Sequence, residues 1–186
     1  MPTRERLRPI LIQTYFSPQI QPLLEEQAFV NLSAFAYAMD VFGGIKESTA
    51  SFAQGPPEIQ RVRDQGFRRA IFNLYDHRCA LCGIRMRTPE GHTVVEAAHI
   101  VPWSESHDDL PTNGLCLCRL CHWSFDEGLM SVGKTYEVLV SDRVRINSNM
   151  PGHVLTLMDR PIFKPEKKRY WPDQANLDRH RKTYFA

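Results

Sequence analysis

Two stretches of sequence decide the fold: CALC at residues 79–82 and NGLCLCRLCHWSFDEG at residues 113–128. Each contains a Cys-x2-Cys pair, and 35 residues separate the inner cysteines of the two pairs. Each pair presents two thiolates from one tight turn, and two such turns complete the tetrahedral sulfur shell that Zn²⁺ prefers. The spacing therefore predicts one structural zinc ion. Its predicted ligands are Cys79, Cys82, Cys118 and Cys121.

Cys116 is the fifth cysteine and the alternative fourth ligand. A strand over residues 115–118 would place Cys116 and Cys118 on the same face. We favour Cys118, because Cys-x2-Cys makes the better metal-binding turn, and we assign Cys116 to the core. The competing interpretations of the set are buried core cysteines or a redox pair. A four-cysteine shell leaves no open coordination position, so this zinc would support folding rather than chemistry.

The composition is that of a globular protein with a buried core. The chain has 186 residues, of which 42% are hydrophobic, 24% charged and 10% aromatic. This length suits one domain of ordinary size, or a small core with helical additions. The net charge of +2 permits a nucleic-acid partner without arguing strongly for one.

Neither membrane insertion nor secretion is indicated by the sequence. No stretch approaches the roughly 20 consecutive apolar residues that span a bilayer. The start, MPTRERLRPI, lacks the apolar run of a signal peptide. The cysteines are odd in number and clustered, which argues against a disulfide framework. We therefore expect a cytoplasmic protein.

The N-terminal part is predicted to be helical from Ile10 to Gly44, with Asn31 or Ser33 as a cap and Gly43-Gly44 at the end. Residues 46–56 have the polar, Pro/Gly-punctuated composition of a linker. The apolar series that predicts this helix is Phe35, Ala38, Val41 and Phe42.

Three further elements are predicted outside the cysteine-rich segment. A second helix runs from Pro57 to about Tyr75. TYEVLV at 135–140 and HVLTLM at 153–158 are β-rich runs that favour a pair of strands. A terminal helix follows Asp173 as its cap and ends near Tyr184. The inward-facing residues of the second helix are Ile59, Val62, Ala70, Ile71 and Leu74.

Three motifs follow one another in the order of a known family. They are A-A-H-I-x-P-W, N-G-L and C-x-x-C-H-x-x-F-D-x-G, and they contain His99, Asn113 and His122. This sequence resembles the HNH endonuclease family, whose catalytic unit is a ββα-metal fold, and its flanks resemble bacterial restriction endonucleases. The resemblance implies an α+β protein: a helical N-terminal segment and linker (1–56), a zinc-stabilised ββα-metal core (57–134) and a strand pair with a terminal helix (135–186).

The resemblance implies a metal-dependent DNA endonuclease, with defence against foreign DNA as its setting. Hydrolysis of a phosphodiester needs an activated water and stabilisation of the charge on the phosphate and the leaving oxygen. We assign His99 as the general base, because a neutral imidazole at the end of a strand can accept a proton from water. Asn113 is assigned to fixing the loop or orienting the base, although Asn-Gly in isolation is more often merely a turn.

His122 and Asp126 are the predicted ligands of a catalytic divalent ion, Mg²⁺, Mn²⁺ or Ni²⁺. They stand at i and i+4 of the helix expected after the second cysteine pair, so they face the same way. A hydrogen-bonding role at a helix end or in a loop is the alternative for Asp126. Ala98 replaces the Asp or His ligand that many relatives place before the base. Glu96 is a weaker substitute, because it lies an odd number of strand positions from His99 and should face away.

The polar loop from Trp103 to Asp109 is interpreted as solvated turn residues rather than as part of the site. Phosphate contact is the predicted use of an arginine-rich neighbourhood, with Arg78 and Arg119 as the leading DNA-binding candidates. The other arginines are Arg61, Arg63, Arg68, Arg69, Arg85 and Arg87.

Two other function classes remain open. A noncatalytic zinc module that binds nucleic acid or protein would need the cysteines but not the three signature residues. The second class is an RNA-cutting HNH enzyme, since the catalytic unit does not itself distinguish RNA from DNA by the 2′-OH. DNA is the expected partner, no membrane contact is expected, and residues 1–44 are the candidate segment for a homodimer.

Overall fold

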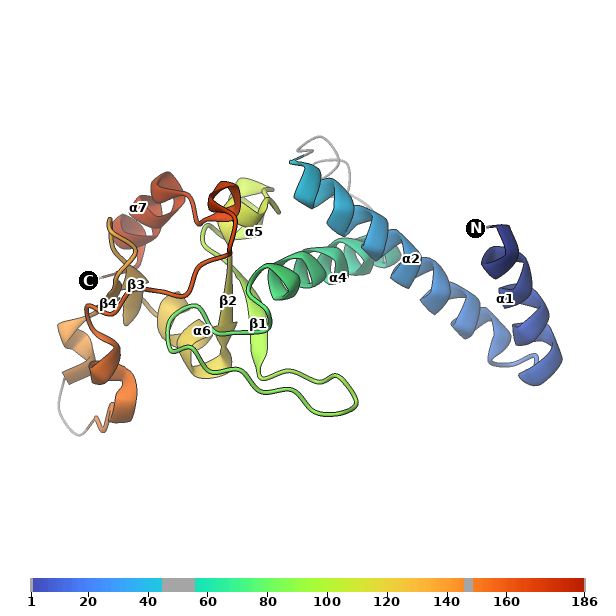
Figure 1. Cartoon of the computed structure of the whole chain (residues 1–186), viewed down its shortest axis with the longest axis horizontal. Helices are drawn as coiled ribbons and strands as arrows, with labels where there is room; N and C mark the ends of the chain where they lie inside the picture. The colour runs from blue at the N-terminus through green and yellow to red at the C-terminus, as the bar shows by residue number, and fades with distance from the viewer. Residues whose placement is uncertain (1, 45–55, 146–148, 186) are drawn as a thin grey trace.

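The computed structural model describes residues 2–44, 56–145 and 149–185. The chain is elongated, with its two termini at opposite ends (Figure 1). The helices are α1 (Pro2–Tyr15), α2 (Gln21–Gly43), α4 (Pro57–Leu74), α5 (Trp103–Ser106), α6 (Arg119–Asp126) and α7 (Gln174–Thr183), with short 3-10 turns at Pro111–Asn113, Asp142–Arg145, Gly152–Leu157 and Lys168–Tyr170. The strands are β1 (Val95–His99), β2 (Gly114–Cys118), β3 (Met130–Val132) and β4 (Val138–Val140).

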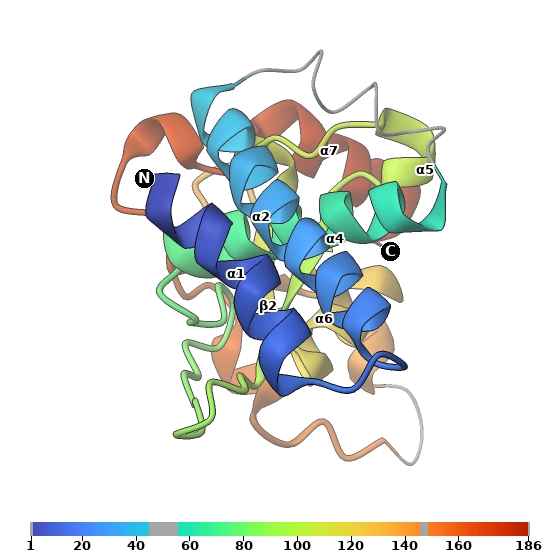
Figure 2. The ribbon, with the colours of Figure 1, turned by 90° about the vertical axis from the view of Figure 1, so that its right-hand side faces the viewer.

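The N-terminal part is two helices rather than the single one predicted from Ile10 to Gly44. The chain turns between Tyr15 and Gln21, so that α1 folds back beside α2 (Figure 2). Asn31 and Ser33 lie inside α2 and cap nothing. The predicted end is confirmed, because Gly44 is in the left-handed conformation at the C-cap. Residues 46–55 of the predicted linker lie outside the described residues.

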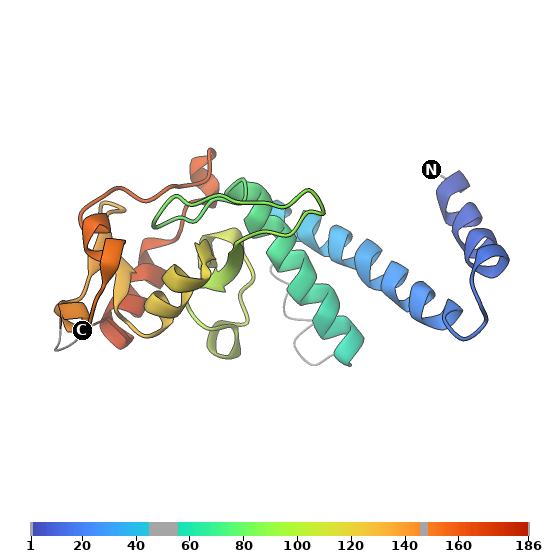
Figure 3. The ribbon, with the colours of Figure 1, turned by 90° about the horizontal axis from the view of Figure 1, so that it is seen from below.

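The second predicted helix is confirmed as α4, which lies between α2 and the sheet of β1 and β2 (Figure 3). One face of α4 packs on α2, where Val62 and Ala70 join a small apolar cluster with Val30 and Val41. Its opposite face contributes Ile71 to the larger core. A side chain at Gly114 would collide with Ile71, so this glycine allows the start of β2 to approach α4 closely.

β1 and β2 form an antiparallel pair whose register determines the geometry of the site. Val95 pairs with Cys118 at one end, and His99 pairs with Gly114 at the other. α6 starts directly after Cys118 and packs against both strands. The succession of two paired strands and a helix is the ββα arrangement that the resemblance implies, and the α+β fold class is confirmed.

The C-terminal region contains one corrected element and one confirmed element. Residues 135–140 contain β4 as predicted, but its partner is β3 and not residues 153–158, most of which form a 3-10 turn. The other edge of β4 is occupied by residues 159–161, which bond to Val138 and bridge to Glu137, so no edge remains for a further strand. Asp173 caps α7 as predicted, accepting a hydrogen bond from the Ala175 N–H at 2.6 Å.

No helix in the described parts of the chain is long and apolar enough to cross a membrane.

Candidate functional site

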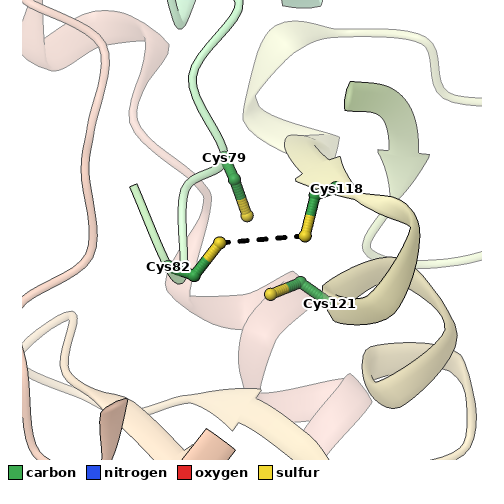
Figure 4. Close-up of side chains that lie close together, drawn as sticks. All are labelled: Cys79, Cys82, Cys118 and Cys121. Atoms are coloured by element: carbon green, nitrogen blue, oxygen red, sulfur yellow. Dashed lines mark hydrogen bonds between the residues drawn. The ribbon is translucent and has the colours of Figure 1, made fainter. Parts of the chain in front are cut away.

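The four predicted zinc ligands converge on one point. Their sulfur atoms all lie within 4.8 Å of one another and point inward (Figure 4). The Sγ atoms of Cys82 and Cys118 are 3.7 Å apart. A tetrahedral zinc with Zn–S bonds of about 2.3 Å separates its sulfurs by about 3.8 Å. The cluster therefore has the donor set and the dimensions that a structural zinc requires.

The electrostatics of the cluster also suit a cation. Hydrogen bonds from the thiols of Cys121, Cys79 and Cys82 hold the pKa of the Cys118 thiol well below its usual range. The cluster thus favours at least one thiolate at neutral pH, and thiolates are the form that binds zinc. Cys118 ends β2 and Cys121 lies in the first turn of α6, so a metal here would fix the angle between strand and helix.

Cys116 lies outside the cluster. It is fully buried in the middle of β2, within the main apolar core. Burial raises the pKa of its thiol to about 12, so it remains neutral at physiological pH. Of the two alternatives for the fourth sulfur, the structure places Cys118 in the cluster and Cys116 in the core.

His99, the predicted base, ends β1 with its imidazole held by a ring stack and a hydrogen bond. Its ring stacks on Phe67 of α4, with centroids 4.0 Å apart and planes inclined by 7°. Nε2 donates to Oδ1 of Asp109 over 2.7 Å. Because a carboxylate can only accept, Nε2 carries the hydrogen and Nδ1 is the nitrogen with a lone pair for a proton. The ring is therefore fixed in the tautomer that a general base needs.

Asn113 holds the loop that follows the base. Its side-chain amide is completely buried: Oδ1 accepts from the Val101 N–H at 2.9 Å, and Nδ2 donates to the Val101 carbonyl at 3.0 Å. Nδ2 also donates to the Asp108 carbonyl at 2.9 Å. Asn113 thus ties the segment after His99 to the segment that delivers Asp109, which is the loop-fixing role rather than direct contact with the base.

His122 lies between two carboxylates. Its Nδ1 is 2.9 Å from Oε2 of Glu96, and its Nε2 is 3.5 Å from Oδ2 of Asp126. A cation can bridge Nε2 and Oδ2 at that separation, while Glu96 accepts the Nδ1 hydrogen and orients the ring. Partial burial raises the pKa of the Asp126 carboxyl group, against the attraction of His122. Glu96 faces away from His99, as expected, but it reaches the other signature histidine.

The two histidines share a cavity of about 440 Å³. It opens between β1, the start of α5, α6 and α7. It is lined by His99, His122 and Asp126 together with Ile100, Pro102, Trp103, Phe125, His180 and Tyr184. The arrangement places a nitrogen base and a potential metal-binding pair around one space large enough for a phosphate group.

The predicted DNA-binding arginines lie in different surroundings. Arg119, at the start of α6, has a side chain 87% exposed, with Nε 3.3 Å from Oε1 of Glu96. Arg119 therefore lies beside the Glu96–His122 hydrogen bond. Arg78 lies over the ring of Phe163, 5.0 Å from the centroid. Arg61 and Arg85 are paired with Glu26 and Asp76, so their charges are already partly compensated.

His180 of α7 is a buried histidine to which the sequence assigned no role. Its Nε2 donates to the Phe125 carbonyl over 3.0 Å, and Nδ1 accepts from the Ser131 hydroxyl at 2.9 Å. Its ring stacks on that of Phe125 at 3.6 Å between centroids. Burial lowers the pKa of His180 to about 4, so the neutral ring holds α7 to the back of the cavity.

We expect this histidine to make the protein less stable in acid. A pKa of about 4 in the folded state against 6.5 for the free side chain means that the unfolded chain binds more protons between these values. Stability should therefore fall as the pH drops from 6.5 to 4, by up to about 3 kcal/mol from this group. Urea titrations of the wild type and of His180→Gln across this range measure the contribution by difference. If the free energy of unfolding of His180→Gln fell with pH as steeply as that of the wild type, this contribution of His180 would be refuted. His92→Gln, at an exposed histidine, is the control and should behave as the wild type does.

Asp109 is the residue at the candidate site that sequence reasoning missed. It belongs to the polar loop interpreted as solvated, yet its side chain is completely buried against His99. Nothing in its immediate sequence separates it from half-buried Asp108 or exposed Glu105. The only available signal was the general rule that a catalytic histidine is oriented by a further hydrogen-bonding group.

Two paired strands, a following helix, a four-cysteine cluster that could hold a metal ion and two histidines lining one cavity define the class of a ββα protein. Residues 79–133 match a family model described as HNH endonuclease. The chain therefore contains an HNH endonuclease-family segment, as the motifs predict. Comparison with curated protein sequences gives no match.

Among solved structures, the chain is similar to one titled "Modification dependent TagI restriction endonuclease". The two are 24% identical with a TM-score of 0.44, over 62% of this chain and 36% of that one. The chain thus spans little more than a third of that protein's length.

Proposed function

We propose that this protein is a metal-dependent endonuclease that hydrolyses phosphodiester bonds in DNA. The observation that carries the proposal is that His99 from β1 and His122 from α6 line one cavity. Both histidines belong to the segment that matches the HNH endonuclease model. A noncatalytic zinc module would have no need for a histidine fixed in its basic tautomer beside a second histidine paired with two carboxylates.

In the proposed mechanism, Nδ1 of His99 accepts a proton from the attacking water while Asp109 retains the Nε2 hydrogen. His122 and Asp126 would hold a divalent ion, and Glu96 would orient His122 through Nδ1. The ion, when bound, supplies positive charge for the phosphate and the leaving oxygen. The exposed Arg119 next to this pair, together with Arg78, would contact flanking phosphates.

We expect cleavage to require an exchangeable divalent ion besides the structural zinc. One imidazole and one carboxylate form a weaker, more open site than four thiolates. A mild chelator should therefore abolish cleavage of plasmid DNA while one zinc per chain remains, and Mg²⁺, Mn²⁺ or Ni²⁺ should restore it. Gel assays beside elemental analysis measure both. Full activity with zinc alone would defeat the proposal.

A matched pair of carboxylate variants locates that second ion. Asp126→Asn should raise the divalent-ion concentration needed for half-maximal cleavage about 10–100-fold, because a ligand is weakened. Glu127→Gln removes the same charge from the next position, which is exposed, and should leave the requirement unchanged. Equal behaviour of the two variants would remove Asp126 from the proposed ligand set.

The choice of nucleic acid is tested on the same protein. Paired DNA and RNA duplexes of one sequence separate a DNA endonuclease from an RNA-cutting enzyme, and binding without cleavage of either would favour the noncatalytic module. Defence against foreign DNA is the setting that we propose from the resemblance to restriction-type HNH proteins. Phage DNA and host DNA compared in the cleavage assay test that setting.

We further propose that the N-terminal helices form a homodimer. α1 and α2 expose large apolar side chains, including Leu11 at 50%, Leu32 at 53% and Phe35 at 59%, and a cavity of about 570 Å³ lies between the two helices. Contiguous exposed apolar surface is typical of an association site. A second copy would supply the same surface and a second cleavage site, as a double-strand break requires.

Sedimentation of the intact chain is expected to give a dimer. Leu11→Glu with Leu32→Glu should give a monomer, because the charges face the proposed partner. Met86→Glu, at a residue 56% exposed in another region of the chain, should leave the dimer intact. A monomeric wild type at micromolar concentration would end this proposal.

A further inference from the structure

We propose that Asp109 is the positioning residue for the base His99, and that Tyr37 of α2 completes this arrangement, so that α2 helps to position the base. The inference rests on the proposed function, since it assigns roles around the same base. It adds two residues that lie outside the three motifs and, in the case of Tyr37, outside the matched segment.

The geometry is a chain of hydrogen bonds that ends at the base. The Tyr37 hydroxyl donates to Oδ2 of Asp109 over 2.6 Å, and Oδ1 of the same carboxylate accepts from Nε2 of His99 over 2.7 Å. Each carboxylate oxygen thus has its own donor. A carboxylate bonded to one nitrogen fixes the orientation and tautomer of an imidazole, and stabilises the imidazolium that forms when the other nitrogen takes a proton.

The burial of Asp109 argues for a functional role. A completely buried carboxylate such as that of Asp109 is strongly destabilising when ionised unless it is paired and hydrogen-bonded. Here the compensation comes from Tyr37, from His99 and from Arg63, whose Nε is 3.7 Å from Oδ2. Arg63 is itself held over the Trp103 ring, 3.7 Å from the centroid. Apolar side chains of similar volume would serve stability as well, so the position of this charged group against His99 points to a role in orienting the base.

Tyr37 is held firmly enough to act as a fixed donor. It is 2% exposed and packs on Gly66, where a Cβ would meet its ring Cδ1 at 2.5 Å. Burial, followed by the nearby Asp109 carboxylate, raises the pKa of Tyr37 far above its usual value, so the hydroxyl remains a donor. The α2–α4 crossing, absent from a bare ββα unit, therefore buries the carboxylate that orients His99.

The decisive experiment is a double-mutant cycle on plasmid cleavage with saturating Mg²⁺ or Mn²⁺. Asp109→Asn should lower kcat about 10²–10⁴-fold with KM within about twofold, because an amide no longer fixes the right tautomer. Tyr37→Phe should lower kcat about 3–10-fold, the effect of one ordinary hydrogen bond, because Tyr37 acts on the base only through Asp109. In a His99→Gln background, neither change should lower the rate further, since both act through that ring.

A spectroscopic readout separates positioning from mere scaffolding. Side-chain ¹⁵N spectra of the wild type should show His99 as the Nε2–H tautomer, and Asp109→Asn should produce a mixture of tautomers while zinc content and helical circular dichroism are retained. Asp108→Asn removes the same charge one residue earlier, where the carboxylate accepts from the Leu110 N–H at 2.8 Å. This control should leave the His99 signals unchanged.

The outcomes distinguish failure of the inference from failure of the proposed function. If the wild type cleaves and His99→Gln does not, but folded Asp109→Asn cleaves at the wild-type rate with an unchanged tautomer, the positioning role is refuted alone. If His99→Gln cleaves normally, the assigned base itself is wrong and the proposed function falls with it. Additive losses in the cycle would also overturn the inference.

Discussion

His99→Gln is expected to cleave DNA about 10²–10⁴-fold more slowly than the wild type, about 3–5 kcal/mol of barrier, while keeping its zinc and its fold. Glutamine is chosen because its amide N–H can still donate to the buried Asp109, which alanine would leave with one donor fewer. The amide cannot accept a proton near neutral pH, so only the chemical step is removed. Initial rates under single-turnover conditions, beside DNA affinity and thermal melting, measure the three properties separately.

His92→Gln is the matched control for this experiment, because His92 is exposed and does not line the cavity that contains His99. It should cleave at the wild-type rate. A folded His99→Gln protein with undiminished cleavage would contradict the assignment of the base and favour the noncatalytic alternative.

Cys118→Ala is expected to lose zinc, thermal stability and activity together. Structural zinc contributes an apparent binding free energy of about 10–16 kcal/mol in small zinc-dependent folds, as much as the whole stability of a typical domain. Cys118 joins β2 to α6, and His122 lies four residues further on. Loss of the metal would therefore loosen the attachment of α6 to β2, and α6 carries the proposed catalytic ligands. Elemental analysis, melting curves and cleavage assays follow the three losses.

Cys116→Ala provides the contrast in the same strand. It removes a buried sulfur that lies outside the cluster, so zinc should be retained and stability should fall by only about 1–2 kcal/mol from lost packing. If Cys118→Ala kept its zinc while Cys116→Ala lost it, the assignment of the fourth ligand would have to be exchanged.

The sequence predicted those parts of the molecule that short-range spacing determines. The two cysteine turns, the helix beginning at Pro57 and the Asp173 cap each depend on residues within a few positions of one another. The i,i+4 spacing on a helix likewise predicted that Asp126 lies beside His122, because this relation does not depend on tertiary contacts.

Long-range contacts account for what could not be predicted. Tyr37 and Asp109 are 72 residues apart, and the loop that delivers Asp109 has the composition of an ordinary solvated turn. Residues 153–158 have the β-branched character of a strand, but the available edge of β4 is taken by residues 159–161. In both cases tertiary competition overrides a local signal.

The contact between Tyr37 and Asp109 also bears on how this fold can be recombined. For joining the proposed cleavage unit to a foreign targeting module, the family match would suggest cutting the chain at residue 79 or just before α4. Either cut would delete α2 and leave a buried carboxylate open to solvent beside the base. The smallest portable unit therefore begins at α2, and a fusion partner belongs in front of residue 21.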